Sequence, residues 1–209
     1  MNRIVYLIDG FNLYHSVKDA NLQTGASTKW LNIHALCKSY ISLFGKDAIL
    51  QGVYYFSAYA YHMRDPAVIE RHKAYVKCLE CTGVSVSMSH FDEKEAHCPY
   101  CNRTFIQHVE KETDIAIASR LFEVASNSSC DTIILVTGDT DLSPAVKTCR
   151  QLYPGKEILF AFPYGRKNKE LKQLATRSFK ISLEAYCSHQ FTDPFVCQDG
   201  TRISKPAGW

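Results

Sequence analysis

Four aspartates stand where hydrophobic, strand-like runs end or where a helix is expected to begin. Asp9 closes the run IVYLID, and Asp139 and Asp141 follow the run IILV in the segment TGDTD. Asp114 stands at the front of the helical segment DIAIASRLFEVA. Carboxylates gathered in one place repel each other unless a cation neutralises them. Mg²⁺ and Mn²⁺ are hard cations that bind oxygen ligands, so these acids predict a metal site for a phosphate-bearing substrate.

Small polar residues accompany the four acids. Asn12 follows the first of them within one turn, at the expected start of a helix, and Gly138 permits a tight turn after a strand. The hydroxyls of Thr137, Thr140 and Ser143 are placed to orient the carboxylates or a bound water. Each acid by itself also fits an ordinary helix cap or turn. Four of them in one strand–helix pattern favour a site.

The elements that must position these residues alternate along the chain. Runs rich in Val, Ile, Tyr and Phe predict strands at 3–8, 50–57, 84–89, 132–137, 157–162 and 179–182. Helical spacing of apolar residues predicts helices at 31–44, 66–80, 114–126, 142–152 and 169–175. This alternation predicts an α/β fold, a doubly wound and mainly parallel sheet with helices on both faces. In such a sheet the carboxyl ends of the strands form the ligand crevice.

Length and composition fit a single medium-sized domain. The 209 residues are 46% hydrophobic and 22% charged, and no apolar run approaches the roughly 20 residues that a membrane span needs. We expect one domain over residues 1–190, followed by a C-terminal tail, 191–209, that loses periodicity and is either edge packing or partly disordered. Nine cysteines, several of them inside apolar patterns, favour a reducing cytoplasm over a disulfide framework.

Basic residues are concentrated in one segment near the end of the predicted domain. The net charge of +3 is weak evidence for any partner, but residues 161–180 hold six basic side chains against one acid. The basic residues are Arg166, Lys167, Lys169, Lys172, Arg177 and Lys180. Such a patch can neutralise phosphates. The alternative is an ordinary solvated helix face.

A second candidate metal site lies in the segment 90–108. Cys98-x-x-Cys101 has the spacing of a zinc knuckle, and His90 and His108 flank the pair, with His97 adjacent. A zinc ion here would be structural and would hold the loop that leads to the acidic helix. The alternative to zinc is a reduced or redox-active cysteine pair.

Another pair of cysteines could complete such a site. Sixteen residues separate Cys78-x-x-Cys81 from the pair Cys98 and Cys101, which fits a simple zinc pattern. However, both residues fall in the last turns of a predicted helix, just before Gly83, where small cysteines are more often part of the core.

Four segments together resemble the NYN family, a branch of the PIN-like nucleases that includes LabA-like bacterial proteins. They are VYLIDGFNLYHS (5–16), EKETDIAIA (110–118), ILVTGDTDLSPAVK (134–147) and PYGRKNKELKQLA (163–175). The resemblance covers roughly residues 3–187, and the ordered combination is more specific than any single motif. It implies a PIN-like fold and metal-dependent, endonucleolytic cleavage of RNA, in which internal phosphodiester bonds are cut.

The resemblance also implies roles for individual residues. The metal-binding acids would be Asp9, Asp114, Asp139 and Asp141, with Asn12 as the polar neighbour of the first and Ser143 as a supporting hydroxyl. Arg166, Lys167, Lys169 and Lys172 would bind the backbone of single-stranded or structured RNA. Aromatic residues such as Tyr14, Phe56 and Tyr164 either stack on unpaired bases or belong to core and rim packing.

Two other functions stay open on this sequence. A metal-dependent phosphatase or nucleotidase would use a similar set of acids, but Asp9 is followed by Gly10, Phe11 and Asn12 and not by a D-x-D-x-T pattern. A non-catalytic RNA-binding or regulatory module of the same fold is the other alternative, although a binder of phosphates has no need of clustered acids. A homodimer with a longer RNA groove is compatible with either reading.

Overall fold

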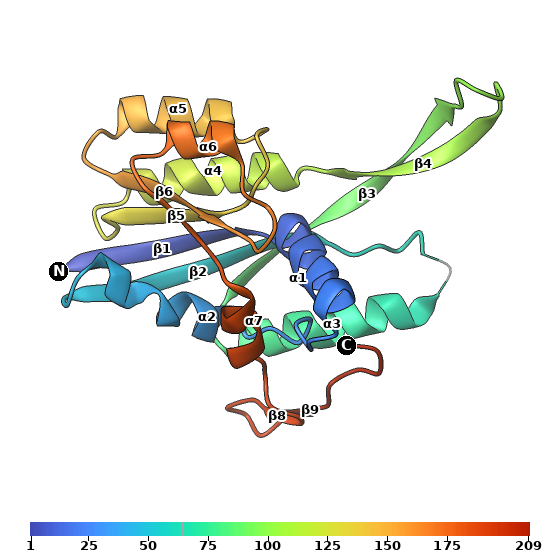
Figure 1. Ribbon diagram of the computed structural model, residues 1–209, viewed down its shortest axis with the longest axis horizontal. Coiled ribbons are helices and arrows are strands. Elements are labelled where there is room, and N and C mark those ends of the chain that lie inside the picture. The colour runs from blue at the N-terminus through green and yellow to red at the C-terminus, as the bar shows by residue number, and fades with distance from the viewer. Residues whose placement is uncertain (64) are drawn as a thin grey trace.

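A computed structural model describes residues 1–63 and 65–209 and shows one large sheet flanked by helices (Figure 1). The strands of this sheet are β1 (Asn2–Asp9), β2 (Ala48–Ala58), β3 (Ser85–His97), β4 (Thr104–Lys111), β5 (Thr132–Val136), β6 (Glu157–Phe162) and β7 (Ser178–Lys180). They lie in the order β4-β3-β2-β1-β5-β6-β7. Each neighbouring pair is parallel except β3 and β4, which are antiparallel.

Helices cover both faces of the sheet. They are α1 (Gly10–Thr24), α2 (Ile33–Ser39), the 3-10 helix η1 (Ile41–Phe44), α3 (Pro66–Cys81), α4 (Thr113–Ser126), α5 (Ser143–Leu152), α6 (Lys169–Leu174) and α7 (Leu183–Ser188). The central strand β1 divides its side chains between the two layers. Ile4, Tyr6 and Ile8 pack with α1, α2, α3 and α7, whereas Val5 and Leu7 pack with α4, α5 and α6 (Figure 1). The predicted α/β fold with a mainly parallel sheet is confirmed.

The side of the sheet on which successive strands are added changes at β1. The first strands are added on one side, as β2 and β3, and the later ones on the other side, as β5, β6 and β7. The carboxyl ends of β1 and β5 therefore lie next to each other at the switch point, where doubly wound folds bind their ligands.

Most of the expected elements occur, with three differences. All six predicted strands are present, but the helix predicted at 31–44 is divided into α2 and η1. Asn32 caps α2 by accepting a hydrogen bond from the backbone N–H of Ala35, and the chain tightens after Tyr40. The strand β4 and the short helix α7 were not predicted. No described helix combines the length and the apolar composition needed to cross a bilayer.

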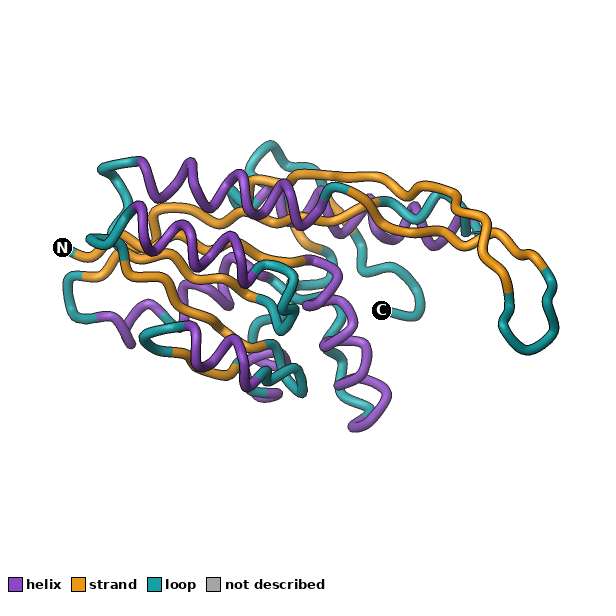
Figure 2. The backbone as a smooth tube through the Cα atoms, turned by 90° about the horizontal axis from the view of Figure 1, so that it is seen from above, coloured by secondary structure: helices purple, strands orange, loops and turns teal. Residues whose placement is uncertain are grey.

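The segment predicted as a zinc-knuckle insertion is part of a long β-arm. The first residues of β3, Ser85–Ser89, pair with β2 inside the sheet, and the remainder, His90–His97, pairs with β4. This hairpin projects away from the body of the molecule (Figures 1 and 2). Most residues of the arm are exposed, including the polar run Asp92–Glu95 and the apolar side chains of Phe105 and Ile106.

The C-terminal segment 191–209 is folded against the body, which corrects the expectation of a partly disordered tail and supports that of packing. It forms a small hairpin, β8 (Phe195–Val196) with β9 (Arg202–Ile203). A disulfide joins Cys197 to Cys81 at the end of α3. The expectation of free cysteines is wrong for these two residues, because the hairpin carries Cys197 onto the helix end. Trp209 packs edge-on against the buried Trp30, with 5.9 Å between ring centroids.

Candidate active site

Asp9 is the most firmly held of the predicted acids. It ends β1 and caps α1, with Oδ1 accepting a hydrogen bond from the backbone N–H of Asn12 at 2.9 Å. Its Oδ2 accepts a bond from the hydroxyl of Thr137 at 2.8 Å, and only 6% of the residue is exposed. Burial raises the pKa of Asp9, the two hydrogen bonds lower it, and the charges of Asp139 and Glu110 raise it further. The carboxylate is therefore held in position by two hydrogen bonds, while its ionised form is destabilised by burial and by the neighbouring acids.

The loop after β5 is bound to the start of α1. The backbone N–H of Gly138 donates to Oδ1 of Asn12 at 2.9 Å. Thr137 accepts a bond from the backbone N–H of Asp139 at 3.0 Å, and Asp139 accepts one from the backbone N–H of Asp141 at 3.1 Å. The structure thus brings the GDTD loop and the first aspartate together, as the sequence predicted.

Asp114 joins this group from the first turn of α4. Partial desolvation, followed by the charges of four nearby carboxylates, raises the pKa of Asp114 to about 6. The four carboxylates are those of Asp9, Asp139, Glu110 and Asp141.

Glu110 is an acid of this cluster that was not among the predicted metal ligands. It lies at the end of β4 and accepts hydrogen bonds from the backbone N–H of Thr113, at 3.1 Å, and from the hydroxyl of the same residue. It therefore closes the first turn of α4. The available sequence signal was its position four residues before Asp114 in EKETD, but only the β-arm shows that this end of β4 reaches the site.

Asp131, at the opposite end of the strands, has an ion-pair partner, in contrast to the acids of the cluster. Asp131, just before β5, forms an ion pair with Arg3 at 2.8 Å, and that guanidinium holds the pKa of Asp131 well below its usual range. Within residues 1–63 and 65–209, none of the ion pairs involves Asp9, Asp114, Asp139 or Asp141. In the described part of the chain, these four aspartates therefore have no ion-pair partner.

Ser143 stands at the start of α5, beside the acidic loop. It is 4% exposed, and its Oγ has no hydrogen-bond partner in the described part of the chain. A buried hydroxyl without a partner costs stability unless another group satisfies it. Ser143 follows Asp139 and Asp141 closely in the sequence, and its role as a supporting hydroxyl stays a prediction.

The basic segment lies against the same loop. Nδ2 of Asn168 donates to the carbonyl oxygen of Gly138 at 3.2 Å, and a side chain on Gly138 would overlap the carbonyl oxygen of Arg166. The Arg166 guanidinium is paired with Asp19 of α1 at 2.5 Å. The other predicted RNA-binding residues are exposed on or before α6: Lys167, Lys169 and Lys172. Asn168, which the sequence analysis did not single out, is the residue that connects this segment to the acids.

The three aromatic candidates have different surroundings. Phe56 is 3% exposed and belongs to the core, so it is not available to stack on a base. Tyr164 is half-buried and packs against the other core layer. Tyr14 is 43% exposed on α1 and is the one of the three that solvent reaches readily.

The donor set of the acidic cluster fits a hydrated Mg²⁺ or Mn²⁺ ion. Among the described residues, no three His, Cys, Asp or Glu side chains are close enough to form a ready-made metal site. Mg²⁺, however, keeps several waters and is often held by only one or two protein carboxylates. The hard oxygen donors, their mutual repulsion and the unpartnered hydroxyl of Ser143 all suit such an ion.

The predicted zinc ligands are not brought together. Cys98 and Cys101 lie at the tip of the arm, whereas His90 pairs with Lys111 at its base. At about 3.3 Å per residue, the strand separates His90 from the tip by roughly 25 Å. The four-residue zinc set is therefore wrong for this structure, because an antiparallel ladder spreads residues that a compact knuckle would gather.

The remaining candidates have other partners. His90 contacts the acids Asp92 and Glu112, at 3.3 and 3.4 Å. His108 stacks on His62, with 4.2 Å between the ring centroids. The alternative cysteine pair is also excluded as a ligand pair: Cys78 is fully buried, and its partner Cys81 forms the disulfide.

Comparison with known proteins relates the chain to a domain family and to a solved structure of similar fold. The model of the NYN domain matches residues 3–183 of the chain. A crystal structure of a protein of unknown function from Vibrio parahaemolyticus aligns with a TM-score of 0.55 at 18% identity, over 87% of this chain and 93% of that one. At this identity the likeness shows the fold alone. No curated protein matched the sequence.

The matched region contains every element that builds the acidic cluster, from β1 through the GDTD loop to α6. Because the family model spans most of the chain, this protein belongs to the NYN domain family.

Proposed function

We propose that the protein is a metal-dependent ribonuclease that cleaves internal phosphodiester bonds of RNA. One observation carries the proposal: carboxylates from β1, the β5 loop and α4 converge at the switch point of the sheet and have no protein cation among the described residues. Membership of the NYN family, whose fold is nuclease-like, supports the same activity.

The acids differ in how they would serve. Asp9 is held rigidly by Asn12 and Thr137, which suits a residue that anchors a metal ion and sets its position. Bound at these carboxylates, Mg²⁺ or Mn²⁺ would activate a water and stabilise the charge that develops on the phosphate oxygens. Asp114 and Asp141 are less constrained, and either can orient the attacking water or accept its proton.

Basic residues near the acids would bind the phosphates of the substrate strand. Lys167, Lys169 and Lys172 are exposed, and the loop that carries them is joined to the GDTD loop through Asn168. A phosphate at the acids would therefore have neighbouring phosphates of the same strand within reach of these lysines. Contacts of this kind position a strand without reading its sequence.

The test is cleavage of end-labelled RNA and single-stranded DNA in Mg²⁺, Mn²⁺ or EDTA by the wild type and by Asp139→Asn. We expect metal-dependent cleavage of RNA that falls by at least about 10²–10³-fold in the variant, since an electrostatic group of the reaction is lost. Binding of RNA by the variant should be retained or tightened, because one negative charge is removed. The matched control is Asp47→Asn, which changes an exposed acid just before β2, at the opposite edge of the sheet.

Two results would contradict the proposal. Wild-type protein that binds RNA but cleaves neither nucleic acid in any metal would point to a non-catalytic binding module. Equal activity of the wild type and Asp139→Asn would show that the cleavage does not arise at these acids.

A further inference from the structure

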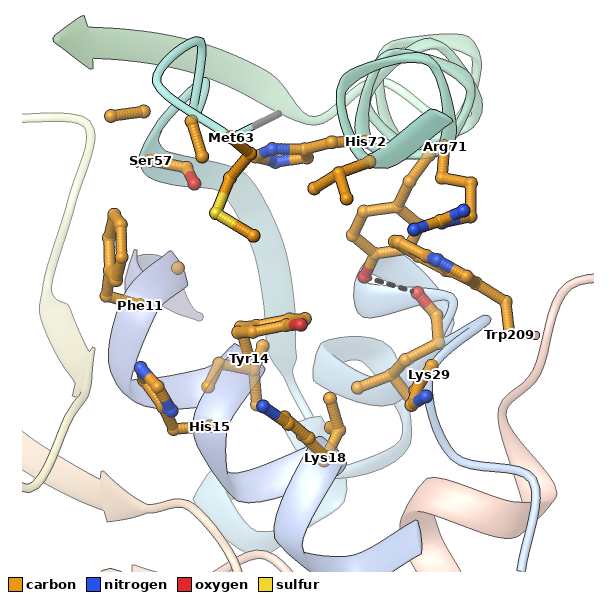
Figure 3. Close-up of a pocket in the computed structure, with 18 of the residues that line it drawn as sticks. Phe11, Tyr14, His15, Lys18, Lys29, Ser57, Met63, Arg71, His72 and Trp209 are labelled. Carbon is orange, nitrogen blue, oxygen red and sulfur yellow. Dashed lines mark hydrogen bonds between the residues drawn. The ribbon is translucent and has the colours of Figure 1, made fainter. Parts of the chain in front are cut away.

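A pocket next to α1 contains none of the four aspartates and is not used by the proposed reaction. It has a volume of about 590 Å³ and lies between α1, the end of β2, α3 and the C-terminal segment (Figure 3). Pockets of about 300–1,000 Å³ with mainly apolar and aromatic walls are typical of sites for small molecules or single nucleotides.

One wall is a single face of α1. Phe11, Tyr14 and Lys18 follow one another along this helix and face the pocket (Figure 3). Residues three and four positions apart lie on the same side of a helix, so an aromatic ring and an ammonium group stand one above the other. Tyr14 is 43% exposed, which leaves a ring face open to a ligand.

The opposite wall comes from α3 and the end of the chain. His72 and Arg71 point in from α3, while Trp209 and Lys29 lie at the far end (Figure 3). The Lys29 ammonium donates to the carbonyl oxygen of Gly208 at 3.1 Å, which fixes this end of the wall. The Cys81–Cys197 disulfide further ties the C-terminal segment to α3. The aromatic residues of the pocket are thus presented by several separate parts of the chain: α1, β2, α3, β3 and the C-terminal segment.

The charge of the pocket is one-sided. Its described lining contains the cations Lys18, Lys29 and Arg71 and no Asp or Glu side chain. Arg71 is only weakly paired, 3.7 Å from the exposed Asp65. Aromatic faces combined with unopposed cations suit a ligand that has a flat ring system and a phosphate. They do not suit a cationic or purely aliphatic ligand.

A polar atom in the wall also lacks a partner. Nδ1 of His62 is buried and has no hydrogen-bond partner among residues 1–63 and 65–209. His62 lines the pocket and is held by its stacking on His108 and by an edge contact with Phe91. Because this nitrogen is buried, it does not face the open space of the pocket, and the ring serves as part of the aromatic wall.

The pocket begins where the acidic cluster ends. Gly10 and Phe11 line it, and they directly follow Asp9 in the sequence. Gly10 lies so close to β2 that a side chain there would overlap the carbonyl oxygen of Phe56 and the ring of Tyr55. The first turn of α1 therefore separates the acidic cluster from the pocket, and the two sites are neighbours along the chain.

We propose that this pocket binds one unpaired base of an RNA strand, with Lys18, Lys29 and Arg71 contacting the phosphates on either side of it. The proposal rests on the proposed ribonuclease function for the identity of the strand, and it adds a subsite that selects single-stranded RNA close to the bond to be cut. Stacking on Tyr14 and Trp209 supplies the recognition of a base, because every base has an aromatic face.

The experiment measures binding in EDTA, where no cleavage takes place. A short, unstructured, fluorescein-labelled RNA is titrated with the full-length wild type, Tyr14→Leu and Lys18→Gln, and fluorescence anisotropy is recorded. We expect the loss of the Tyr14 ring to weaken binding by about 5- to 100-fold. Tyr100→Leu, at the exposed tip of the arm, and Lys38→Gln, on α2, are the matched controls and should bind as the wild type does.

A second set of RNAs has a single abasic site at successive positions. We expect one position at which the missing base weakens wild-type binding as much as Tyr14→Leu does, with no further loss when both changes are combined. Tryptophan fluorescence supplies an independent signal, because Trp209 lines the pocket whereas Trp30 is fully buried. RNA should quench this emission in the wild type and not in Trp209→Phe.

Each other outcome overturns the proposal. Equal affinity of the wild type and both pocket variants would show that the strand does not enter the pocket. Equal affinity for all the abasic RNAs would reduce the pocket to a phosphate contact. A nucleoside monophosphate that binds as tightly as the RNA would identify a free nucleotide as the ligand.

The result is separable from that of the cleavage test. Wild-type protein that shows the base-dependent binding but never cleaves RNA would refute the ribonuclease and leave the base pocket standing. Metal-dependent cleavage of RNA with the same KM in the wild type and in Tyr14→Leu would support the ribonuclease and refute the base pocket.

Discussion

The acidic cluster and the tip of the β-arm were both expected to bind metal ions, and the fold treats them in opposite ways. The acids are far apart in the sequence, from Asp9 to Asp141, yet they meet at one end of the sheet. The zinc candidates are close in the sequence, from His90 to His108, yet the hairpin separates them. Closeness in the sequence was therefore a poorer guide to a shared site than position at the ends of parallel strands.

The reason lies in the direction of the strands. Parallel strands bring their carboxyl ends to the same edge, so acids at those ends must meet whatever their sequence separation. In an antiparallel ladder each residue has one partner across from it, and residues along the same strand move apart by about 3.3 Å per position. The following changes test this contrast, from the largest expected effect to the smallest.

Gly138→Ala should damage the acidic site most severely. The new methyl group would overlap the carbonyl oxygen of Arg166, so the GDTD loop must move. A displacement of about 1 Å at a reacting group can cost about 10²-fold in rate, and the overlap itself should lower the free energy of unfolding by about 1–3 kcal/mol. RNA cleavage rates and urea denaturation measure the two effects.

Gly155→Ala is the control for this change, since a side chain there meets nothing within 4 Å. It should retain wild-type cleavage. If Gly138→Ala also did so, the close approach of the basic loop to the acids would have no role in activity.

Asn12→Ala should have the next largest effect. It removes the acceptor for the N–H of Gly138 and so frees the loop from α1. Outer-shell partners of metal ligands typically contribute about 10- to 100-fold to activity or metal affinity. We expect a loss of this size in cleavage, together with a higher Mg²⁺ concentration at half-maximal rate, whereas Asn21→Ala at the other end of α1 should leave both unchanged.

Asp114→Asn should change the pH dependence of stability. The pKa of Asp114 in the folded protein is about 6, above its ordinary value of 3.8, so its contribution to stability is present below pH 4 and is lost as the pH rises through 6. In EDTA at neutral pH the variant should therefore be the more stable protein, by about 1 kcal/mol after a discount for solvent screening. Urea midpoints between pH 4 and pH 7 test this difference.

Addition of Mg²⁺ should reverse this order, because the wild type then gains the free energy of binding the ion. A difference between the two proteins that does not depend on pH, or that Mg²⁺ leaves unaltered, would show that the charges of the cluster are not what destabilises it.

The double change Cys98→Ser with Cys101→Ser should have the smallest effect. Both residues lie at the tip of a solvent-exposed arm, so the free energy of unfolding should change by less than about 0.5 kcal/mol. A structural zinc site would instead contribute on the order of 10 kcal/mol. One equivalent of bound zinc in the purified protein, lost in the double variant, would contradict the contrast between the two regions.

The predictable part of this protein followed from local patterns. The alternation of β-branched runs with helical spacing indicated the parallel sheet, and the acids at strand ends indicated the cluster of Asp9, Asp114, Asp139 and Asp141. These features are readable because strand and helix periods are properties of short segments, and because the topology of a doubly wound sheet leaves one place for its strand ends to meet.

The remainder depended on contacts between segments that no local pattern connects. Glu110 reaches the acids only because β4 pairs with the long β3, and Cys81 meets Cys197 only because the C-terminal hairpin folds onto α3. The pocket between Tyr14, His72 and Trp209 is likewise built from segments that are far apart in the sequence. The amino-acid sequence by itself determined the sheet and the acids at its switch point. The tertiary structure alone decided what surrounds them, because long-range packing is a property of the whole chain.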